Sequence, residues 1–246
     1  LSDFKPYLSK ISFKEIDKAV CNKITKIGGP SSMQSLFEVG LFTGAVWLSG
    51  MIGTSAQAAN QIALSMASMT FMFASGLGVA AMIRVGNQKG FQDYVKLRVV
   101  ALSIILMTIL LYTFFALFFV IFHSYIPLFF LDAEDAKNAL LNREVIDMAG
   151  KLLMIAAIFQ ISDGIQVTVL GALRGLQDVN IPTIITFISY WLIGFPVAIY
   201  LGLYTAMGAE GIWYGLLAGL TAAAIFSYLR LNYMTKKLIH SQQAKA

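Results

Sequence analysis

Apolar residues run through this chain in six long stretches that are separated by short polar connections. The stretches cover residues 28–52, 55–83, 99–122, 148–173, 182–203 and 208–229. Each is long enough to cross about 30 Å of hydrocarbon as a helix rising about 1.5 Å per residue. Strands of a membrane barrel would be about half as long and would alternate in polarity. The pattern therefore predicts an all-α polytopic membrane protein with six transmembrane helices.

The composition favours a membrane protein over a soluble domain. Hydrophobic residues make up 58% of the chain and charged residues 13%, whereas soluble domains have roughly 45–50% and about 25%. The net charge is +5, but the basic residues occupy the ends and connections, so we expect no nucleic-acid partner. Cys21 is the only cysteine, which excludes an intrachain disulfide and a metal site made of thiolates.

Lysine and arginine are distributed unevenly between the two sides that six spans define. Fifteen of the 18 lie in the leader, the second and fourth connections and the tail, and the other three are Lys137, Arg143 and Lys151. Cytoplasmic loops of membrane proteins carry an excess of these residues. Both termini are therefore predicted to lie in the cytoplasm, on the same side, as an even number of spans requires.

The spans divide the chain into a leader of residues 1–26, a transmembrane lobe of residues 27–232 and a cytoplasmic tail of residues 233–246. Apolar residues at helical spacing opposite the lysines predict that the leader is an amphipathic cytoplasmic linker. An ordinary basic connector is the alternative. The chain begins at Leu1 without a methionine, which favours a fragment of a longer protein, although a processed or trimmed chain would begin in the same way.

The connection 123–147 is the longest one outside the predicted spans. It begins with an aromatic segment, residues 125–130, that contains Pro127. Aromatic residues gather at membrane interfaces, so the segment predicts a short interfacial helix or a bent helix end. A substrate lid is the alternative.

Two carboxylates stand alone inside apolar stretches. Glu38 is the only charged residue between Ile27 and Ile83, and Asp163 is the only one between Leu152 and Leu173. A charge at membrane depth costs about 2.5 to 17 kcal/mol, so such residues are rare and usually mark an ion or substrate pathway. The two residues therefore predict membrane transport.

Glu38 shares one helix face with Pro30 and Gln34, because the three recur every four residues. A carboxylate two turns inside a span, supported by the amide of Gln34, can take up a proton or bind a cation. The alternative is a structural Glu38 that is hydrogen-bonded to another helix.

Asp163 lies near the middle of its span, at the depth where transporter sites commonly lie. Gln160, Ser162 and Gln166 surround it on the same helix turns. We expect Asp163 to couple to a cation, with these neighbours supporting it, and Na⁺ is a tentative ligand of both carboxylates. A buried Asp163 bonded to serine or glutamine is the alternative.

Polar and aromatic residues in the second and fifth spans add candidates for the substrate path. Gln61 belongs to a series of amides, hydroxyls and methionines that either supports close helix packing or lines a pocket for hydrophobic cations. Tyr190 precedes Gly194 and Pro196, which predict a kink. Its ring either faces a cavity, faces lipid or packs between helices.

Seven short motifs in this order resemble the MATE family, the multidrug and toxic compound extrusion antiporters. They are P-x3-Q-x3-E at 30–38, A-A-N-Q at 58–61, R-V-G-N-x2-G at 84–90, F-Q-I-S-D at 159–163, L-R-G-L-Q-D at 173–178, Y-W-x2-G-x-P at 190–196 and G-x2-G-x-W-x-G at 208–215. The resemblance covers nearly the whole chain. It implies a transporter of twelve helices in two lobes, of which this chain is similar to the second, C-terminal lobe of the NorM-like branch.

The resemblance implies a bacterial inner-membrane antiporter that exchanges Na⁺ or H⁺ for amphipathic or cationic drugs. Glu38 and Asp163 occupy the positions at which the NorM-like branch keeps its cation-coupling carboxylates. The expected partners are the drugs, membrane lipids and a first six-helix lobe, with no cofactor beyond the coupling ion.

Three other functions remain open from the residues alone. A lipid-linked oligosaccharide flippase should have an arginine-lined cavity, whereas the membrane interior here is acidic. An enzyme would require a nucleophile or a metal-binding histidine in the spans, and His123 is the only histidine near one, so we expect no enzyme. The third is a membrane fragment that does not transport.

Overall fold

Six long helices make up the computed structural model, which describes residues 17–131 and 139–244. Five of them are continuous: α2 (Lys18–Ile52), α3 (Thr54–Gly90), α4 (Tyr94–Phe122), α5 (Ala139–Gly175) and α8 (Ala209–Gln243). The fifth span, between α5 and α8, consists of three consecutive segments: α6 (Asn180–Phe187), η4 (Ile188–Gly194) and α7 (Phe195–Leu203). All six are long and apolar enough to cross a membrane, and the described residues contain no strand. The predicted all-α, multi-pass architecture is confirmed.

Several helices extend beyond the apolar stretches that predicted them. The side chain of Asp17 accepts a hydrogen bond from the backbone nitrogen of Ala19 at 2.8 Å, so α2 begins at Lys18, inside the predicted leader. Residues 1–16 of that leader lie outside the described residues. At the other end α8 continues to Gln243, through most of the predicted tail. Lysine and glutamine are good helix formers, whereas hydropathy marks only the part suited to hydrocarbon.

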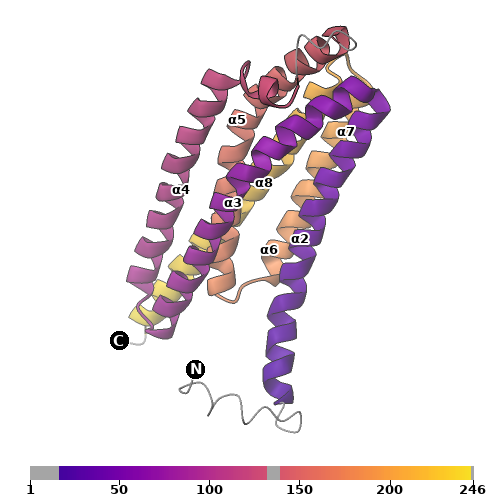
Figure 1. The fold of residues 1–246 in the computed structure, drawn as a ribbon. Coiled ribbons are helices and arrows are strands. Elements are labelled where there is room, and N and C mark those ends of the chain that lie inside the picture. The colour runs from indigo at the N-terminus through magenta and orange to yellow at the C-terminus, as the bar shows by residue number, and fades with distance from the viewer. Residues whose placement is uncertain (1–16, 132–138, 245–246) are drawn as a thin grey trace, which may run out of the picture.

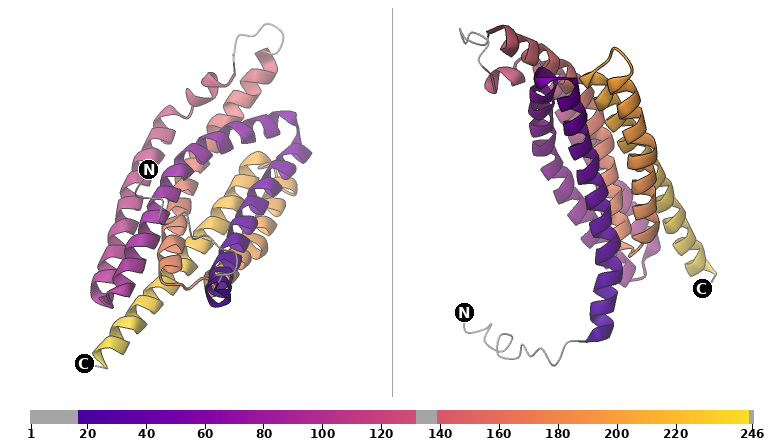
Figure 2. Two further views of the ribbon diagram at one scale, coloured as in Figure 1. Left: turned by 60° about the horizontal axis from the view of Figure 1, so that its bottom comes forward. Right: turned by 90° about the vertical axis from the view of Figure 1, so that its right-hand side faces the viewer.

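α5 is the central helix of the bundle, with α3, α4 and α8 packed against it. α2 lies at the edge, where it touches α3, α8 and the fifth span. α2 and α3 meet at a turn around Gly53 and diverge away from it (Figure 1 and Figure 2). The first and last described helix ends lie at the same end of the bundle (Figure 1), as six spans require.

Glycines allow the backbones of neighbouring helices to touch. A Cβ atom on Gly171 of α5 would collide with the carbonyl group of Gly78 in α3, and one on Gly215 of α8 would collide with the backbone of Ala198 in α7. Small residues serve this purpose in membrane helices because they permit close dispersion contacts. A ring fills the space beside Gly164, where a Cβ would lie 2.8 Å from Cδ2 of Tyr112. The close approaches at Gly164 and Gly171 are therefore made by neighbouring helices.

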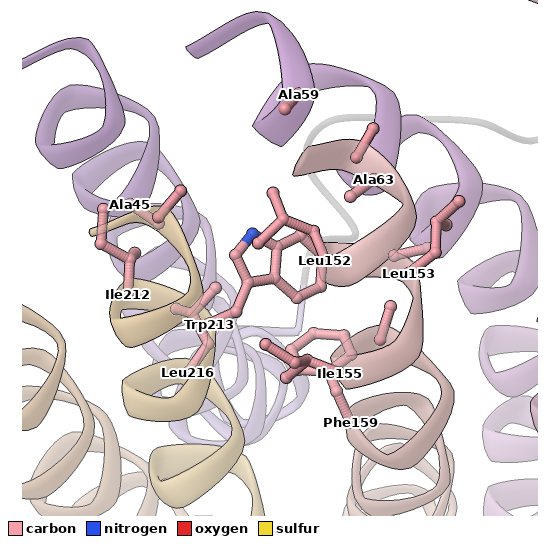
Figure 3. Packing of buried hydrophobic residues seen from close by; sticks show 14 of the residues in the cluster. Ala45, Ala59, Ala63, Leu152, Leu153, Ile155, Phe159, Ile212, Trp213 and Leu216 are labelled. Carbon is pink, nitrogen blue, oxygen red and sulfur yellow. The ribbon is translucent and has the colours of Figure 1, made fainter. Parts of the chain in front are cut away.

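Trp213 is the largest side chain in the main core (Figure 3). Its ring packs against Phe159 with the ring centroids 5.3 Å apart, and Leu152 and Leu216 also belong to this core. The Nε1 atom of Trp213 donates to Oδ1 of Asn60 at 2.9 Å. This bond ties α8 to α3 and satisfies the indole in an apolar interior.

The fifth span contains the predicted irregularity as a π-helical segment, η4. Pro196 follows it in the first turn of α7, where the missing N–H group disturbs the preceding turn. The ring of Trp191 packs at Gly40 of α2 and the ring of Phe195 at Gly44. α2 thus rests on two aromatic side chains of the fifth span.

The aromatic segment after α4 forms a short 3₁₀ helix, η3 (Ile126–Phe129), with Pro127 near its start. The predicted short helix is confirmed. Phe129 and Tyr125 are exposed, which suits an anchor at the membrane interface.

Candidate functional site

A cavity of about 760 Å³ lies between α2, α3 and α5. Both isolated carboxylates, Glu38 of α2 and Asp163 of α5, line it. Its lining residues are Ser35, Glu38, Val39, Phe42, Thr43, Val46, Gln61, Leu64, Ser65, Ala67, Ser68, Phe71, Phe159 and Asp163. Two residues 125 positions apart in the sequence thus reach one space.

Glu38 lies on the α2 wall of the cavity and is partly buried. Its carboxylate makes no hydrogen bond or ion pair with any residue that the structure describes. Val39, Phe42 and Val46 extend the same wall by helical spacing. Glu38 therefore reaches the cavity with a carboxylate that has no hydrogen-bond or ion-pair partner among the described residues.

Asp163 lies deeper, on the α5 wall, with only 4% of its surface exposed. Its Oδ1 atom is fully buried and has no hydrogen-bond partner in the structure. Asp163 and Glu38 are close enough to interact electrostatically. A buried carboxylate without a partner is costly, so a proton or a cation would stabilise it.

The remaining walls combine polar groups with aromatic rings. Gln61, Ser65 and Ser68 of α3 supply an amide and two hydroxyls, and the hydroxyl of Ser65 donates to the carbonyl oxygen of Gln61 at 2.8 Å. Phe42 and Phe159 meet edge to face with centroids 5.9 Å apart. Carboxylate, amide and hydroxyl oxygens suit hard cations, and the apolar surface suits greasy compounds.

Gln34 lies outside the cavity wall, although it shares a helix face with Glu38. Its Nε2 atom donates to Oγ1 of Thr183 at 3.2 Å and to the carbonyl oxygen of Val179 at 3.4 Å, and its Oε1 atom accepts from Arg174 at 2.9 Å. These partners belong to the start of the fifth span and the end of α5. Gln34 therefore joins three elements one turn away from the carboxylate.

The remaining candidates, on α5 and the fifth span, do not line the cavity. The hydroxyl of Ser162 shares a hydrogen bond of 3.0 Å with Thr221 of α8, and the hydroxyl of Tyr190 donates to Oε1 of Gln166 at 2.7 Å. Gln160 is buried, and neither of its side-chain polar atoms has a partner in the structure. Of the eight candidate residues, the structure brings Glu38, Asp163 and Gln61 together at the cavity.

The polar series of the second span supplied the cavity residues Gln61, Ser65 and Ser68, whereas sequence reasoning missed the aromatic residues Phe42 and Phe159. Phe42 follows Glu38 by one helical turn, and Phe159 precedes Asp163 by one turn. Both could have been predicted as cavity residues, because a residue four positions before or after a carboxylate lies on the same face of its helix. Thr43 and Val46 lie on the same wall of α2.

The described residues contain no group of three or more histidine, cysteine, aspartate or glutamate side chains that could hold a metal ion. Two carboxylates with neutral oxygen donors instead match a weakly held, exchangeable cation or a proton. A ligand held by so few donors in so wide a cavity would exchange readily.

Known proteins resemble this chain over nearly its whole length. The family model described as MatE matches residues 30–200. The multidrug resistance protein NorM of Photobacterium profundum is 35% identical over 231 residues, which are 92% of this chain and 48% of that protein. The multidrug resistance protein MdtK of Proteus mirabilis is 37% identical over 219 residues, 87% of this chain and 46% of that protein.

Solved structures share the fold. An outward-facing conformation of a multidrug resistance MATE family transporter matches with a TM-score of 0.81 and 18% identity, covering 94% of this chain and 50% of that one. A eukaryotic MATE transporter matches with a TM-score of 0.77 and 20% identity, covering 95% of this chain and 53% of that one. The chain spans about half the length of the curated relatives it matches.

Proposed function

The chain belongs to the MATE family, and from that membership we propose that it is one lobe of a secondary active multidrug efflux antiporter. It would be the second six-helix lobe, and its partner would be a first lobe of similar size. The coverage of about half of each curated relative supports this proposal. The transported compounds would be amphipathic, often cationic molecules, exchanged for Na⁺ or H⁺.

One observation carries the proposal: Glu38 and Asp163 line the same cavity. Two carboxylates in one space repel each other unless a positive charge or a proton joins them. Entry of a coupling cation would therefore change the electrostatics of three helices at once. Such a ligand shifts a conformational equilibrium by as much as its affinity differs between the two states.

The cavity also suits the proposed cargo. Its volume of about 760 Å³ falls within the range of roughly 300–1,000 Å³ that is typical of small-molecule sites. Phenylalanine and valine side chains offer apolar contact without fixed geometry, which favours variable substrates. The lining residues include no lysine or arginine, which disfavours the anionic cargo of a flippase.

The coupling ion would run down its gradient from outside to inside. The membrane potential alone supplies about 2.3 kcal/mol per charge per 100 mV. We place both termini in the cytoplasm and the protein in the bacterial inner membrane. The uneven distribution of Lys and Arg supports this orientation.

The first prediction concerns Asp163. Asp163→Asn keeps the size of the side chain and removes the ionisable group, so folding should be retained while gradient-driven drug efflux falls to background. The measurement is efflux from proteoliposomes that contain the complete transporter, driven by an imposed Na⁺ or pH gradient. Drug binding can survive, because affinity and coupling are separate free energies.

Two further variants sharpen this test. Glu38→Gln should reduce coupled efflux, with a smaller loss than Asp163→Asn because Glu38 is more exposed. Asp147→Asn is the matched control, since Asp147 lies on the same helix but is exposed and paired with Lys151 at 2.9 Å. Undiminished gradient-dependent efflux by Asp163→Asn would exclude the proposed coupling site.

A further inference from the structure

Arg174 is a cation in the last turn of α5 whose guanidinium group is incompletely paired. Its Nη2 atom donates to Oε1 of Gln34 at 2.9 Å, while its Nε atom is buried and has no partner in the structure. The side chain is half-buried, and a charge that is partly removed from water normally requires a carboxylate or several acceptors to offset its desolvation. The hydrogen-bond partner that the structure gives Arg174 is the neutral side-chain amide of Gln34.

The acidic residue closest to Arg174 in the sequence is already occupied. Asp178 pairs with Nε of Arg230 at 2.7 Å, and Arg230 also lies over the ring of Tyr233. The carboxylate that acts electrostatically on Arg174 is Glu38. Arg174 therefore has an acidic neighbour with which it makes no ion pair in this conformation.

The position of Gln34 explains how the two charges are kept apart. Gln34 and Glu38 are four residues apart on α2, so their Cβ atoms lie about 5–6 Å from each other. The guanidinium that now rests on Gln34 is thus one helical turn from the Glu38 carboxylate. Gln34 itself is fixed by Thr183, whose hydroxyl also donates to the carbonyl oxygen of Pro30 at 3.0 Å.

We propose that Arg174 is a movable counter-ion of Glu38, and that Gln34 is the site where its guanidinium rests when a cation occupies the cavity. This inference depends on the proposed cation coupling at Glu38. Without a cation, the guanidinium leaves Gln34 and pairs with the Glu38 carboxylate. With a cation bound, it returns to the Oε1 atom of Gln34.

The proposal makes Arg174 a competitor of the coupling cation and therefore a positioning residue. Removing the guanidinium removes the competitor, so the cation should bind more tightly. Removing the Gln34 amide takes away the resting site, so the guanidinium should stay on Glu38 and the cation should bind more weakly. The two substitutions act in opposite directions, which a purely structural role would not produce.

The experiment measures the concentration of the coupling cation that gives half-maximal efflux by the complete transporter in proteoliposomes. Arg174→Gln should lower this concentration at least threefold, and Gln34→Leu should raise it at least threefold. The double variant should behave like Arg174→Gln, because Gln34 acts only through the guanidinium. Arg174→Lys keeps a mobile charge and should stay within about twofold of the wild type, and the KM of the drug should not follow these shifts.

Arg98 provides the matched control. Its guanidinium also joins two helices, donating to Oγ1 of Thr235 at 3.1 Å and to Oδ1 of Asn232 at 2.8 Å, but it has no carboxylate partner in the described chain. Arg98→Gln should lower the melting temperature without changing the half-maximal cation concentration. Shifts of the same sign in Arg174→Gln and Gln34→Leu, or no shift in either, would overturn the proposal.

The design separates this inference from the proposed function. If Asp163→Asn retains coupled efflux, the coupling site itself is wrong. If Asp163→Asn is uncoupled but the Arg174 and Gln34 variants keep the wild-type cation dependence, only the counter-ion is wrong. Should Arg174→Gln fail to fold, Gln34→Leu alone decides, because only a released guanidinium makes the cation bind more weakly.

Discussion

At the scale of single residues, α5 carries buried and half-buried polar side chains that face several different partners. Gln166 meets Tyr190 of the fifth span, Thr168 meets Thr108 of α4 at 2.9 Å, and Ser162 meets Thr221 of α8. Each bond crosses from the central helix to a different neighbour. These bonds fix the rotation of α5, which in turn directs Asp163 into the cavity.

The bond between Tyr190 and Gln166 should have a measurable effect on stability. Tyr190→Phe removes a fully buried donor and leaves the Oε1 atom of Gln166 without a partner, since the bond of 2.7 Å is the only one this atom makes in the structure. Hydrogen bonds between membrane helices average about 0.6 kcal/mol and reach roughly 1.7. We expect a loss within that range, measured by thermal unfolding in detergent.

Tyr200→Phe is the control for this prediction, because Tyr200 is 64% exposed and its hydroxyl donates to no described residue. Adding Gln166→Leu to Tyr190→Phe should recover part of the loss, since removing both partners leaves no unsatisfied group. Equal unfolding temperatures for Tyr190→Phe and Tyr200→Phe would contradict the assignment.

Residues of the candidate site could be recognised from the sequence only where the residue type is rare in its surroundings. Glu38 and Asp163 stood out because charges in apolar spans are costly, and both line the cavity. Gln34 and Ser162 share a span with a carboxylate, but their bonding partners lie in elements distant in sequence, Arg174 and Thr221. The spacing of residues along one helix predicts which side chains share a face of that helix. It does not predict which other helix packs against that face.

At the scale of helices, the crossing of α3 and α5 depends on the absence of side chains. Gly171 faces the backbone of Gly78, and a Cβ on Gly175 would lie 2.5 Å from the carbonyl oxygen of Met82. Two such points along the pair hold the helices at short distance. This crossing holds α3, which supplies Gln61 and Ser65 to the cavity, against the helix that carries Asp163.

Gly171→Ala should therefore destabilise the lobe, even though alanine is the better helix former. Overpacking costs typically about 1–3 kcal/mol, and the obstructing atoms are backbone. Gly76→Ala on α3 is the matched control, because no atom lies within 4 Å of the added methyl group. Unfolding in detergent should show a lower midpoint for Gly171→Ala and an unchanged or higher one for Gly76→Ala; the reverse order would refute the close crossing.

The number and order of the helices could be predicted because each span needs its own long apolar stretch. The predicted C-terminal ends agree with the structure for α2, α4 and the fifth span, at residues 52, 122 and 203. The start of α2 and the end of α8 could not be predicted, since polar helical turns continue past the apolar part. The π-helical geometry of η4 was predictable only as a kink near Gly194 and Pro196.

At the scale of the whole molecule, the two ends of the bundle differ in charge. One end carries the described chain termini together with Lys89, Arg98, Arg174 and Arg230, and the opposite end carries Arg143 and Lys151. The excess of basic residues predicts that the first end faces the cytoplasm. Cys21, exposed near the start of α2, lies at that end.

Labelling of Cys21 can test this orientation. In a complete transporter whose other cysteines are replaced, a membrane-impermeant maleimide should label Cys21 in inside-out vesicles and spare it in intact cells. Ser124→Cys combined with Cys21→Ser should give the opposite result, because Ser124 is exposed at the other end of the bundle. Labelling of Cys21 in intact cells would show that the topology is inverted.

The contacts of α2 have a mechanical consequence. α3 with α5, and α7 with α8, are joined where backbone meets backbone at glycines, so neither pair can slide without separating. α2 instead rests on the rings of Trp191 and Phe195 at Gly40 and Gly44, and rings can turn between rotamers while they stay in contact. Apart from the hydrogen bonds of Gln34, α2 has no such backbone crossing with the fifth span among the described residues, so we expect the lobe to yield more readily at α2, the helix that carries Glu38, than at the glycine crossings.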